Sequence, residues 1–152
     1  MSASPARDRH LAAIRLALGF VYFHFGLLKF FPDLSPAELV ASQTVSRLSL
    51  AWIDARSALL WLGALECAIG LGFLFLSSSL RRWVFYLFVF HMVGTFLPLL
   101  YLPGLMFKVA PFAPTLDGQY VLKNLVLLAA GCAVLSTPAR APELGGGQER
   151  AA

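Results

Sequence analysis

The sequence contains few charged residues. Of its 152 residues only 13% are charged, whereas 59% are hydrophobic, and the mean hydropathy is +0.74. A soluble domain carries roughly 25% charged residues because its surface must be hydrated. The shortage of charge therefore argues against a soluble domain and predicts that lipid covers much of the surface. The 12 Lys and Arg residues are scattered along the chain, which argues against a nucleic-acid partner.

Cysteine and metal-binding patterns are also scarce. The two cysteines, Cys67 and Cys132, each lie within an apolar stretch, so we expect both to be small buried hydrophobic residues. Because no CxxC pair is present, redox chemistry would need a bound cofactor or a partner protein. The histidines do not follow a metal-ligand spacing such as HxxxH, and we therefore expect no metal site.

Long apolar runs are what the sequence has in abundance. Four runs are close to the roughly 20 residues that cross a hydrocarbon core, at residues 11–31, 58–76, 83–101 and 120–135. Within lipid the backbone polar groups must bond internally, which favours helices. The sequence therefore predicts an all-α integral membrane protein, a four-transmembrane-helix bundle that forms one domain over residues 1–137. Residues 138–152 are predicted to be a disordered cytoplasmic tail.

The two loops predicted on the outer side have patterns of their own. Ser35 followed by Pro36 and Glu38 is typical of a capping box with proline at the first helical position. The apolar and polar residues after it predict an amphipathic helix that lies on the outer interface. The second outer loop is rich in proline, which forbids a long helix. We expect it to fold back as a lid over the mouth of the bundle.

Basic residues near the ends of the runs predict the orientation. One side collects Arg7, Arg9, Arg15, Arg81, Arg82 and Arg140. The opposite side has basic residues accompanied by acidic ones. Since cytoplasmic loops carry an excess of Lys and Arg, both termini are predicted to be cytoplasmic.

Ionisable residues within the apolar runs are the main functional signal. Such residues are costly in lipid and usually face a partner or a cavity. They are His24, Lys29, Glu66, His91 and Lys123, and Thr95 and Asn124 add uncharged polar groups. With alternating helices and a rise of about 1.5 Å per residue, the five ionisable residues fall in the same outer half of the bilayer. We interpret them as a polar pocket.

Within this pocket, His91 and Glu66 are the candidate proton carriers. The candidate lining residues are Lys123, Asn124, His24, Thr95 and Lys29. Simpler interpretations stay open: Lys29 extends its ammonium to the outer interface, Glu66 forms a structural ion pair with Lys123, and each histidine makes only a helix–helix hydrogen bond. Pro98 would leave the Gly94 carbonyl without its helical donor and so add a polar wall.

Four short motifs resemble the DoxX-like family of membrane proteins. They are residues 25–32 (FGLLKFFP), 66–70 (ECAIG), 91–96 (HMVGTF) and 118–124 (GQYVLKN). The resemblance covers most of the chain and implies a four-helix membrane bundle. It also implies that Lys29, Glu66, His91 and Lys123 are signature residues. The family takes its name from a subunit of a thiosulfate:quinone oxidoreductase.

Two classes of function stay open. An aromatic-rich apolar pocket with a few polar groups suits a quinone, and the chain would then be a quinone-interacting or membrane-anchoring component of an oxidoreductase system, with a protein partner that supplies electrons. It would not be a complete enzyme alone. The alternative is a non-catalytic binding, transport or assembly subunit for a small molecule or metal. In either case the chain could form a homo-oligomer. Either protein is expected in the lipid bilayer of a bacterial inner (plasma) membrane.

Overall fold

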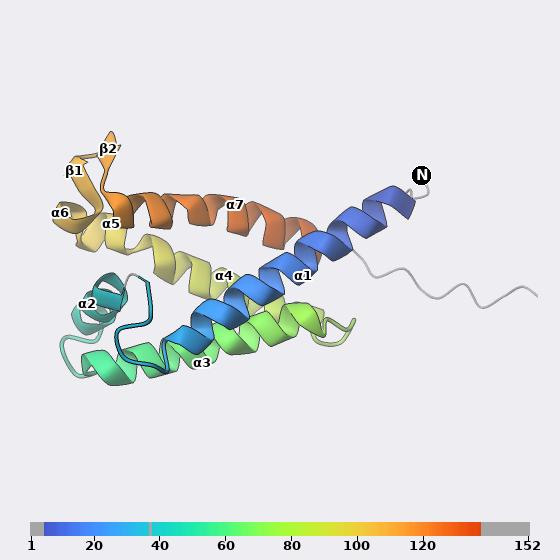
Figure 1. The fold of residues 1–152 in the computed structure, drawn as a ribbon, viewed down its shortest axis with the longest axis horizontal. Helices are drawn as coiled ribbons and strands as arrows, with labels where there is room; N and C mark the ends of the chain where they lie inside the picture. The colour runs from blue at the N-terminus through green and yellow to red at the C-terminus, as the bar shows by residue number, and fades with distance from the viewer. Residues whose placement is uncertain (1–4, 37, 138–152) are drawn as a thin grey trace, which may run out of the picture.

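The computed structural model describes residues 5–36 and 38–137, so the predicted tail lies outside the described residues. Four long helices dominate it (Figure 1). The elements are α1 (Pro5–Leu28), α2 (Glu38–Leu48), α3 (Ala55–Leu74), α4 (Arg81–Phe96), α5 (Pro98–Tyr101), α6 (Pro103–Met106), β1 (Phe107–Val109), β2 (Ala113–Pro114) and α7 (Leu116–Ser136). Four helical segments, Ala6–Leu28, Ala55–Leu74, Arg81–Tyr101 and Leu116–Ser136, are long and apolar enough to cross a membrane, which confirms the four predicted runs.

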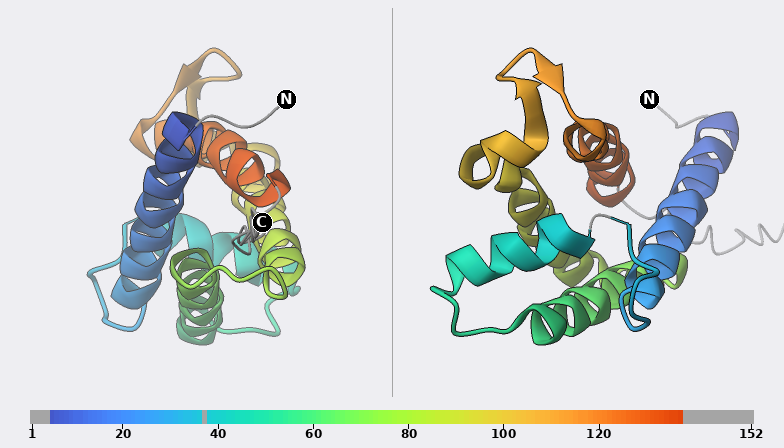
Figure 2. Two further views of the ribbon diagram at one scale, coloured as in Figure 1. Left: turned by 90° about the vertical axis from the view of Figure 1, so that its right-hand side faces the viewer. Right: turned by 60° about the vertical axis from the view of Figure 1, so that its left-hand side comes forward.

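The long helices pack side by side and alternate in direction (Figures 1 and 2). Contacts join α1 to α3 and α7, and α4 to α3 and α7. The end at which α2, α5, α6 and the two strands gather is called the hairpin end, and the other end the opposite end (Figure 1). Many large apolar side chains point outward, such as Trp61, Trp83 and Phe90. This outer surface is compatible with lipid contact.

Capping residues explain where two of the helices begin. Asp54 caps α3 by accepting a hydrogen bond from the Ser57 amide at 3.0 Å, and this bond lowers the pKa of Asp54 below its ordinary value. Thr115 caps α7 through the Gly118 amide at 3.1 Å. Both helices therefore start a few residues earlier than the apolar runs predict.

The predicted amphipathic helix is present, but its start differs from the predicted capping box. The helix α2 begins at Glu38 rather than at Pro36. The Ser35 hydroxyl donates to the Pro36 carbonyl at 3.3 Å and accepts none of the described helix amides. Pro36 itself remains in the loop before the helix.

The proline-rich loop forms short elements and folds back on the bundle. Its helices α5 and α6 are one turn long, and β1 pairs with β2 in an antiparallel hairpin. Leu102 and Met106 from this loop pack with Val40 of α2 and Val121 of α7 in a small buried cluster. The short helices of this loop and α2 lie together at the hairpin end, whereas the β1–β2 hairpin projects outward beyond α7 (Figures 1 and 2).

The interface between α1 and α3 is closely packed because glycines lie on both helices. A Cβ atom at Gly70 would lie 2.4 Å from the backbone nitrogen of Phe23, and one at Gly26 would lie 2.7 Å from that of Cys67. Gly63 likewise faces the Gly26 carbonyl. Small residues let helix backbones approach closely, as the sequence predicts for these positions.

Arginines tie α1 and α3 together at both ends. Arg15 of α1 donates to the carbonyls of Phe73 and Leu74, where α3 ends, at 2.9 and 2.8 Å. Arg56 of α3 donates to the carbonyls of Lys29 and Phe30, just after α1, at 3.1 and 2.6 Å. Each helix therefore supplies the donor that the other's final carbonyls lack.

The same device joins other elements. Arg81, at the start of α4, donates to the carbonyls of Val134 and Thr137 near the end of α7. Arg47 of α2 donates to the Tyr101 carbonyl at the end of α5 at 2.7 Å. For Arg56 and Arg81 the alternating direction of the helices makes this possible, since the start of one helix lies beside the end of its neighbour, whereas Arg15 lies in the middle of α1 and Arg47 in the last turn of α2.

Candidate functional site

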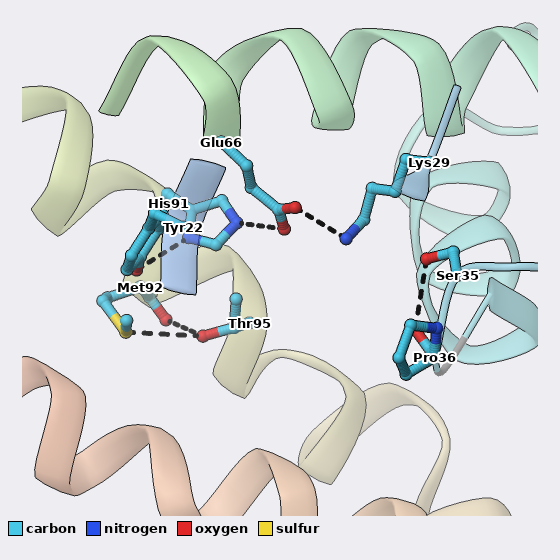
Figure 3. Close-up of polar contacts among 8 residues, drawn as sticks. All are labelled: Tyr22, Lys29, Ser35, Pro36, Glu66, His91, Met92 and Thr95. Atoms are coloured by element: carbon cyan, nitrogen blue, oxygen red, sulfur yellow. Dashed lines mark hydrogen bonds and ion pairs between the residues drawn. The ribbon is translucent and has the colours of Figure 1, made fainter. Parts of the chain in front are cut away.

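Glu66 of α3 lies at the centre of a buried group of polar side chains (Figure 3). Its Oε2 atom accepts a hydrogen bond from the Lys29 ammonium at 2.6 Å. Its Oε1 atom lies 3.0 Å from His91 Nε2. The side chains of Lys29, Glu66 and His91 are only 8%, 10% and 5% exposed. A carboxylate buried to this degree needs such partners.

Tyr22 extends the group beyond His91. Its hydroxyl oxygen lies 3.3 Å from His91 Nδ1, and the two rings meet edge to face at 5.4 Å (Figure 3). A neutral imidazole that donates its Nε2–H to Glu66 leaves Nδ1 to accept the Tyr22 O–H. We call Tyr22, Lys29, Glu66 and His91 the polar array.

Helical spacing brings the array together. Lys29 follows α1 directly, seven residues after Tyr22 and thus about two helical turns along the same face, with Gly26 between them. The missing side chain at Gly26 matters, because a Cβ atom there would lie 2.9 Å from the Glu66 Cβ. Gly26 therefore lets α3 approach far enough for Glu66 to reach Lys29. His91 joins from α4.

The surroundings of the array are apolar and aromatic. Phe73 and Phe88 pack against the Tyr22 ring at 6.3 and 5.7 Å, and both are fully buried. Throughout residues 5–36 and 38–137, each buried side-chain nitrogen or oxygen has a hydrogen-bond partner. With His91 neutral, the negative charge of the Glu66 carboxylate and the positive charge of the Lys29 ammonium cancel.

Two of the sequence-predicted residues lie away from the array. His24 is exposed on α1, where its ring stacks on Phe20 at 5.6 Å. Lys123 is exposed on α7, with its ammonium 5.1 Å from the centre of the Tyr120 ring. The prediction that all five ionisable residues gather in one pocket is therefore wrong for these two. Their helices turn them outward.

The two simpler interpretations of Lys29 and Glu66 are also corrected. Lys29 does not extend to the surface, because Gly26 and the α1–α3 contact place its ammonium on Glu66. The partner of Glu66 is thus Lys29 rather than Lys123. Each correction follows from close helix packing, which the composition of the separate runs does not specify.

The predicted uncharged lining residues do not join the array either. The Thr95 hydroxyl donates to the Met92 carbonyl at 2.8 Å, within its own helix (Figure 3). Asn124 is half-buried on α7 and makes no hydrogen bond to the array. The Gly94 carbonyl accepts the Leu97 amide at 3.2 Å, so the polar wall predicted beside Pro98 is absent.

Tyr22 is the array residue that the sequence analysis missed. A tyrosine in an apolar run is typical of an aromatic core residue, and its hydroxyl alone does not indicate a functional site. The available signal was its spacing, since Tyr22 lies two turns before Lys29 on the same face of the helix. Figure 3 shows Tyr22 at one end of the array and Lys29 at the other.

The described residues contain no cluster of three or more His, Cys, Asp or Glu side chains that would hold a metal ion. Cys67 and Cys132 are free thiols. Both are half-buried rather than fully buried as expected. The Cys67 sulfur lies 3.7 Å from the Phe23 carbonyl oxygen at the α1–α3 interface.

A hollow of about 410 Å³ lies at the hairpin end. It is lined by Asp33, Ser35, Glu38, Leu39 and Ser42, none of which is a predicted site residue.

Comparison with known protein families, with curated proteins and with solved structures finds no match to this chain. The resemblance to DoxX-like proteins therefore stays a prediction.

Proposed function

We propose that the chain is a four-span membrane protein of DoxX-like type and that its polar array carries protons for a membrane quinone. In this proposal it is one component of an oxidoreductase system, and another protein supplies or takes the electrons. The observation that carries the proposal is the buried chain of a phenol, an imidazole and a carboxylate. Such a chain moves a proton without exposing a charge to lipid.

The four array residues divide the work. His91 Nδ1 holds the proton that moves. Glu66 accepts from Nε2, fixes the ring, and stabilises the imidazolium that forms when Nδ1 is protonated. Lys29 keeps Glu66 ionised by balancing its charge. Tyr22 ends the array beyond His91 and is 5% exposed, so the proposal requires the packed helices to part for a substrate to reach its hydroxyl.

The hydrogen-bond capacity of Tyr22 fits both forms of a quinone. With His91 neutral, the Tyr22 O–H donates to Nδ1, and its oxygen is left to accept a bond from a quinol hydroxyl. With His91 protonated, Nδ1 donates to the Tyr22 oxygen, and the phenol O–H is left for a quinone carbonyl. When Tyr22 passes its hydroxyl proton to His91 Nδ1, the Tyr22 oxygen takes a proton from the quinol hydroxyl. The electrons leave to the partner protein.

The proposal is tested by measuring small molecules that remain with the detergent-purified protein. We expect about one quinone per chain in the wild type and several-fold less in Tyr22→Phe and His91→Ala. His24→Ala is the matched control, since His24 is exposed and outside the array, and it should retain the quinone. A wild type that carries only bulk lipid would overturn the proposal.

One observation favours a second candidate, a non-catalytic binding or assembly subunit. Every array side chain already has a partner inside the protein, which a purely structural ion-pair network would also require. In that case Tyr22→Phe would lower stability by about 1 kcal/mol, the worth of one hydrogen bond, and would leave the bound lipids unchanged. The same mass spectrometry therefore separates the two candidates.

A further inference from the structure

The turn between α2 and α3, residues 49–53, presents two apolar side chains to the outside of the molecule. Leu50 is 83% exposed and Trp52 is 90% exposed, the highest value among the large apolar side chains in the part of the chain that the structure describes. Neither side chain belongs to either of the buried clusters. The fold therefore gains little from having a leucine and a tryptophan at these positions. We call residues 49–53 the α2–α3 turn.

The backbone of the α2–α3 turn does not favour a leucine at position 50. The Ala51 amide donates to the Ser46 carbonyl at 2.7 Å, and the Leu50 amide donates to the Arg47 carbonyl at 3.3 Å. This pair of bonds is the Schellman motif, in which the residue after the helix cap takes the left-handed conformation and is usually glycine. Here that residue is Leu50, with φ at 51°, and Ala51 follows with φ at 64°. Because a side chain is costly in this conformation, the turn by itself does not explain Leu50.

The α2–α3 turn lies at the level of the bilayer surface in the membrane insertion that the proposed function requires. Asp54 caps α3, and the segment that is able to span the membrane starts at Ala55, three residues after Trp52. Three residues of chain extend at most about 10 Å, and the polar interface on each side of the hydrocarbon is roughly 5–8 Å thick. Figure 2 shows the turn at the edge of the molecule, where α2 meets α3, rather than over the centre of the bundle. Leu50 and Trp52 therefore lie within reach of the surrounding headgroups.

We infer that Leu50 and Trp52 anchor the hairpin end to the membrane by inserting into the headgroup boundary of the surrounding phospholipid. This inference rests on the membrane insertion in the proposed function and is independent of the quinone. Tryptophan is enriched at this boundary because its ring is apolar and its N–H is polar. Burial of the Leu50 side chain in lipid offsets the cost of its backbone conformation.

The small size of the exposed surface favours lipid over a protein as its partner. The side chains of Leu50 and Trp52 together offer roughly 400 Å², whereas a stable protein interface takes about 800 Å² from each partner. A bilayer needs no such area on the turn, since the long helices already hold the protein in it.

The natural tryptophans provide the test. The chain has three, Trp52, Trp61 and Trp83, and Trp61 is 75% exposed within α3. One protein retains Trp52 alone, with Trp61→Phe and Trp83→Phe, and a control protein retains Trp61 alone, with Trp52→Phe and Trp83→Phe. Each full chain is reconstituted into phosphatidylcholine vesicles with bromine near the headgroup end or near the methyl end of the acyl chains. Bromine quenches tryptophan fluorescence at close range, so the loss of emission reports the depth of the ring.

We expect Trp52 to lose more emission with bromine near the headgroup end than with bromine near the methyl end. Trp61 should lose emission with both lipids, because it lies within the span. If Trp61 lost emission and Trp52 did not, membrane insertion would stand and the inference would fall. No loss for either protein would refute the membrane insertion itself. Trp52 emission at shorter wavelength than in water, unquenched by either lipid, would place a second copy of the chain on the turn and overturn the inference.

A pair of glycine substitutions tests the part that Leu50 plays. In the protein that retains Trp52 alone, Leu50→Gly and Ala51→Gly each place glycine at a left-handed residue, so both variants should fold. Only Leu50→Gly removes a large apolar side chain. We expect Leu50→Gly to reduce the quenching of Trp52 by bromine near the headgroup end and Ala51→Gly to leave it unchanged. Unchanged quenching in Leu50→Gly, or the same reduction in both variants, would overturn the role of the Leu50 side chain.

Discussion

Lys29 and Lys123 both lie in apolar stretches of the sequence, yet the fold gives them different surroundings. Lys29 is 7% exposed and its ammonium lies 2.6 Å from Glu66, whereas Lys123 is exposed beside the Tyr120 ring. An ammonium that is buried without a carboxylate costs several kcal/mol, while an exposed one reaches polar surroundings by extending its side chain. The two residues should therefore respond differently to the same substitution.

We predict that Lys29→Met lowers the free energy of unfolding by about 3–5 kcal/mol, because it leaves the buried Glu66 carboxylate with His91 alone. Lys123→Met is the matched control and should change it by less than about 1 kcal/mol. Denaturant titration in detergent micelles measures both. The double variant Lys29→Met/Glu66→Leu should recover most of the loss. Equal losses for the two single variants would contradict the role of the buried pair.

The α1–α3 pair is the element on which the array depends. Glycines bring the two backbones together, and Arg15 and Arg56 bind the final carbonyls of the partner helix at either end. The contact, which runs from Arg15 to the end of α1, sets the rotation of α1 relative to α3. That rotation in turn decides that Lys29 faces Glu66.

We predict that Gly70→Ala lowers the free energy of unfolding by about 1–3 kcal/mol, the usual cost of overpacking. The added Cβ would lie 2.4 Å from the Phe23 nitrogen and 2.9 Å from the Gly19 carbonyl oxygen, and backbone atoms move only if the helices separate. Thermal unfolding in detergent measures the effect.

The control for this substitution is Gly94→Ala on α4, where the added Cβ has no atom within 4 Å. It should raise stability by up to about 1 kcal/mol, since alanine has the higher helix propensity. If both substitutions had the same sign, close packing at Gly70 would not be what holds α1 against α3.

The whole molecule has two chemically different ends. Acidic residues such as Asp33, Asp54 and Asp117 gather at the hairpin end, and Arg81 and Arg82 lie at the opposite end. Because basic residues stay in the cytoplasm, this asymmetry predicts that the hairpin end faces outward. The predicted orientation places Lys29 nearer the outer surface than Tyr22.

Cysteine labelling tests both insertion and orientation. In a background with Cys67→Ala and Cys132→Ala, a single cysteine is introduced as Phe112→Cys in the hairpin or as Ser78→Cys at the opposite end, where both positions are exposed. A membrane-impermeant maleimide should label only the Phe112→Cys protein in intact cells. It should label the Ser78→Cys protein after permeabilisation. The reverse pattern would refute the predicted orientation, and labelling of both proteins in intact cells would refute membrane insertion.

Apolar runs, prolines and glycines were sufficient to predict the long helices, the lack of a long helix in the proline-rich loop and the close α1–α3 contact. These features follow from local composition. An apolar run favours a helix and a proline ends one, whatever the position of the rest of the chain. Helix starts were less predictable. Asp54 and Thr115 extend α3 and α7 by capping amides beyond the apolar runs.

The membership of the array needed the fold. Glu66 and His91 were expected together and lie 3.0 Å apart, yet His24 and Lys123 have the same chemistry and turn outward. Which face of a helix meets its neighbour depends on the rotation and approach of the two helices. Hydropathy and spacing do not determine this rotation and approach. The glycine contacts between α1 and α3, together with the hydrogen bonds of Arg15 and Arg56, do determine them. The sequence thus specifies that charged groups enter the apolar helices, and helix packing specifies that Tyr22, Lys29, Glu66 and His91 meet.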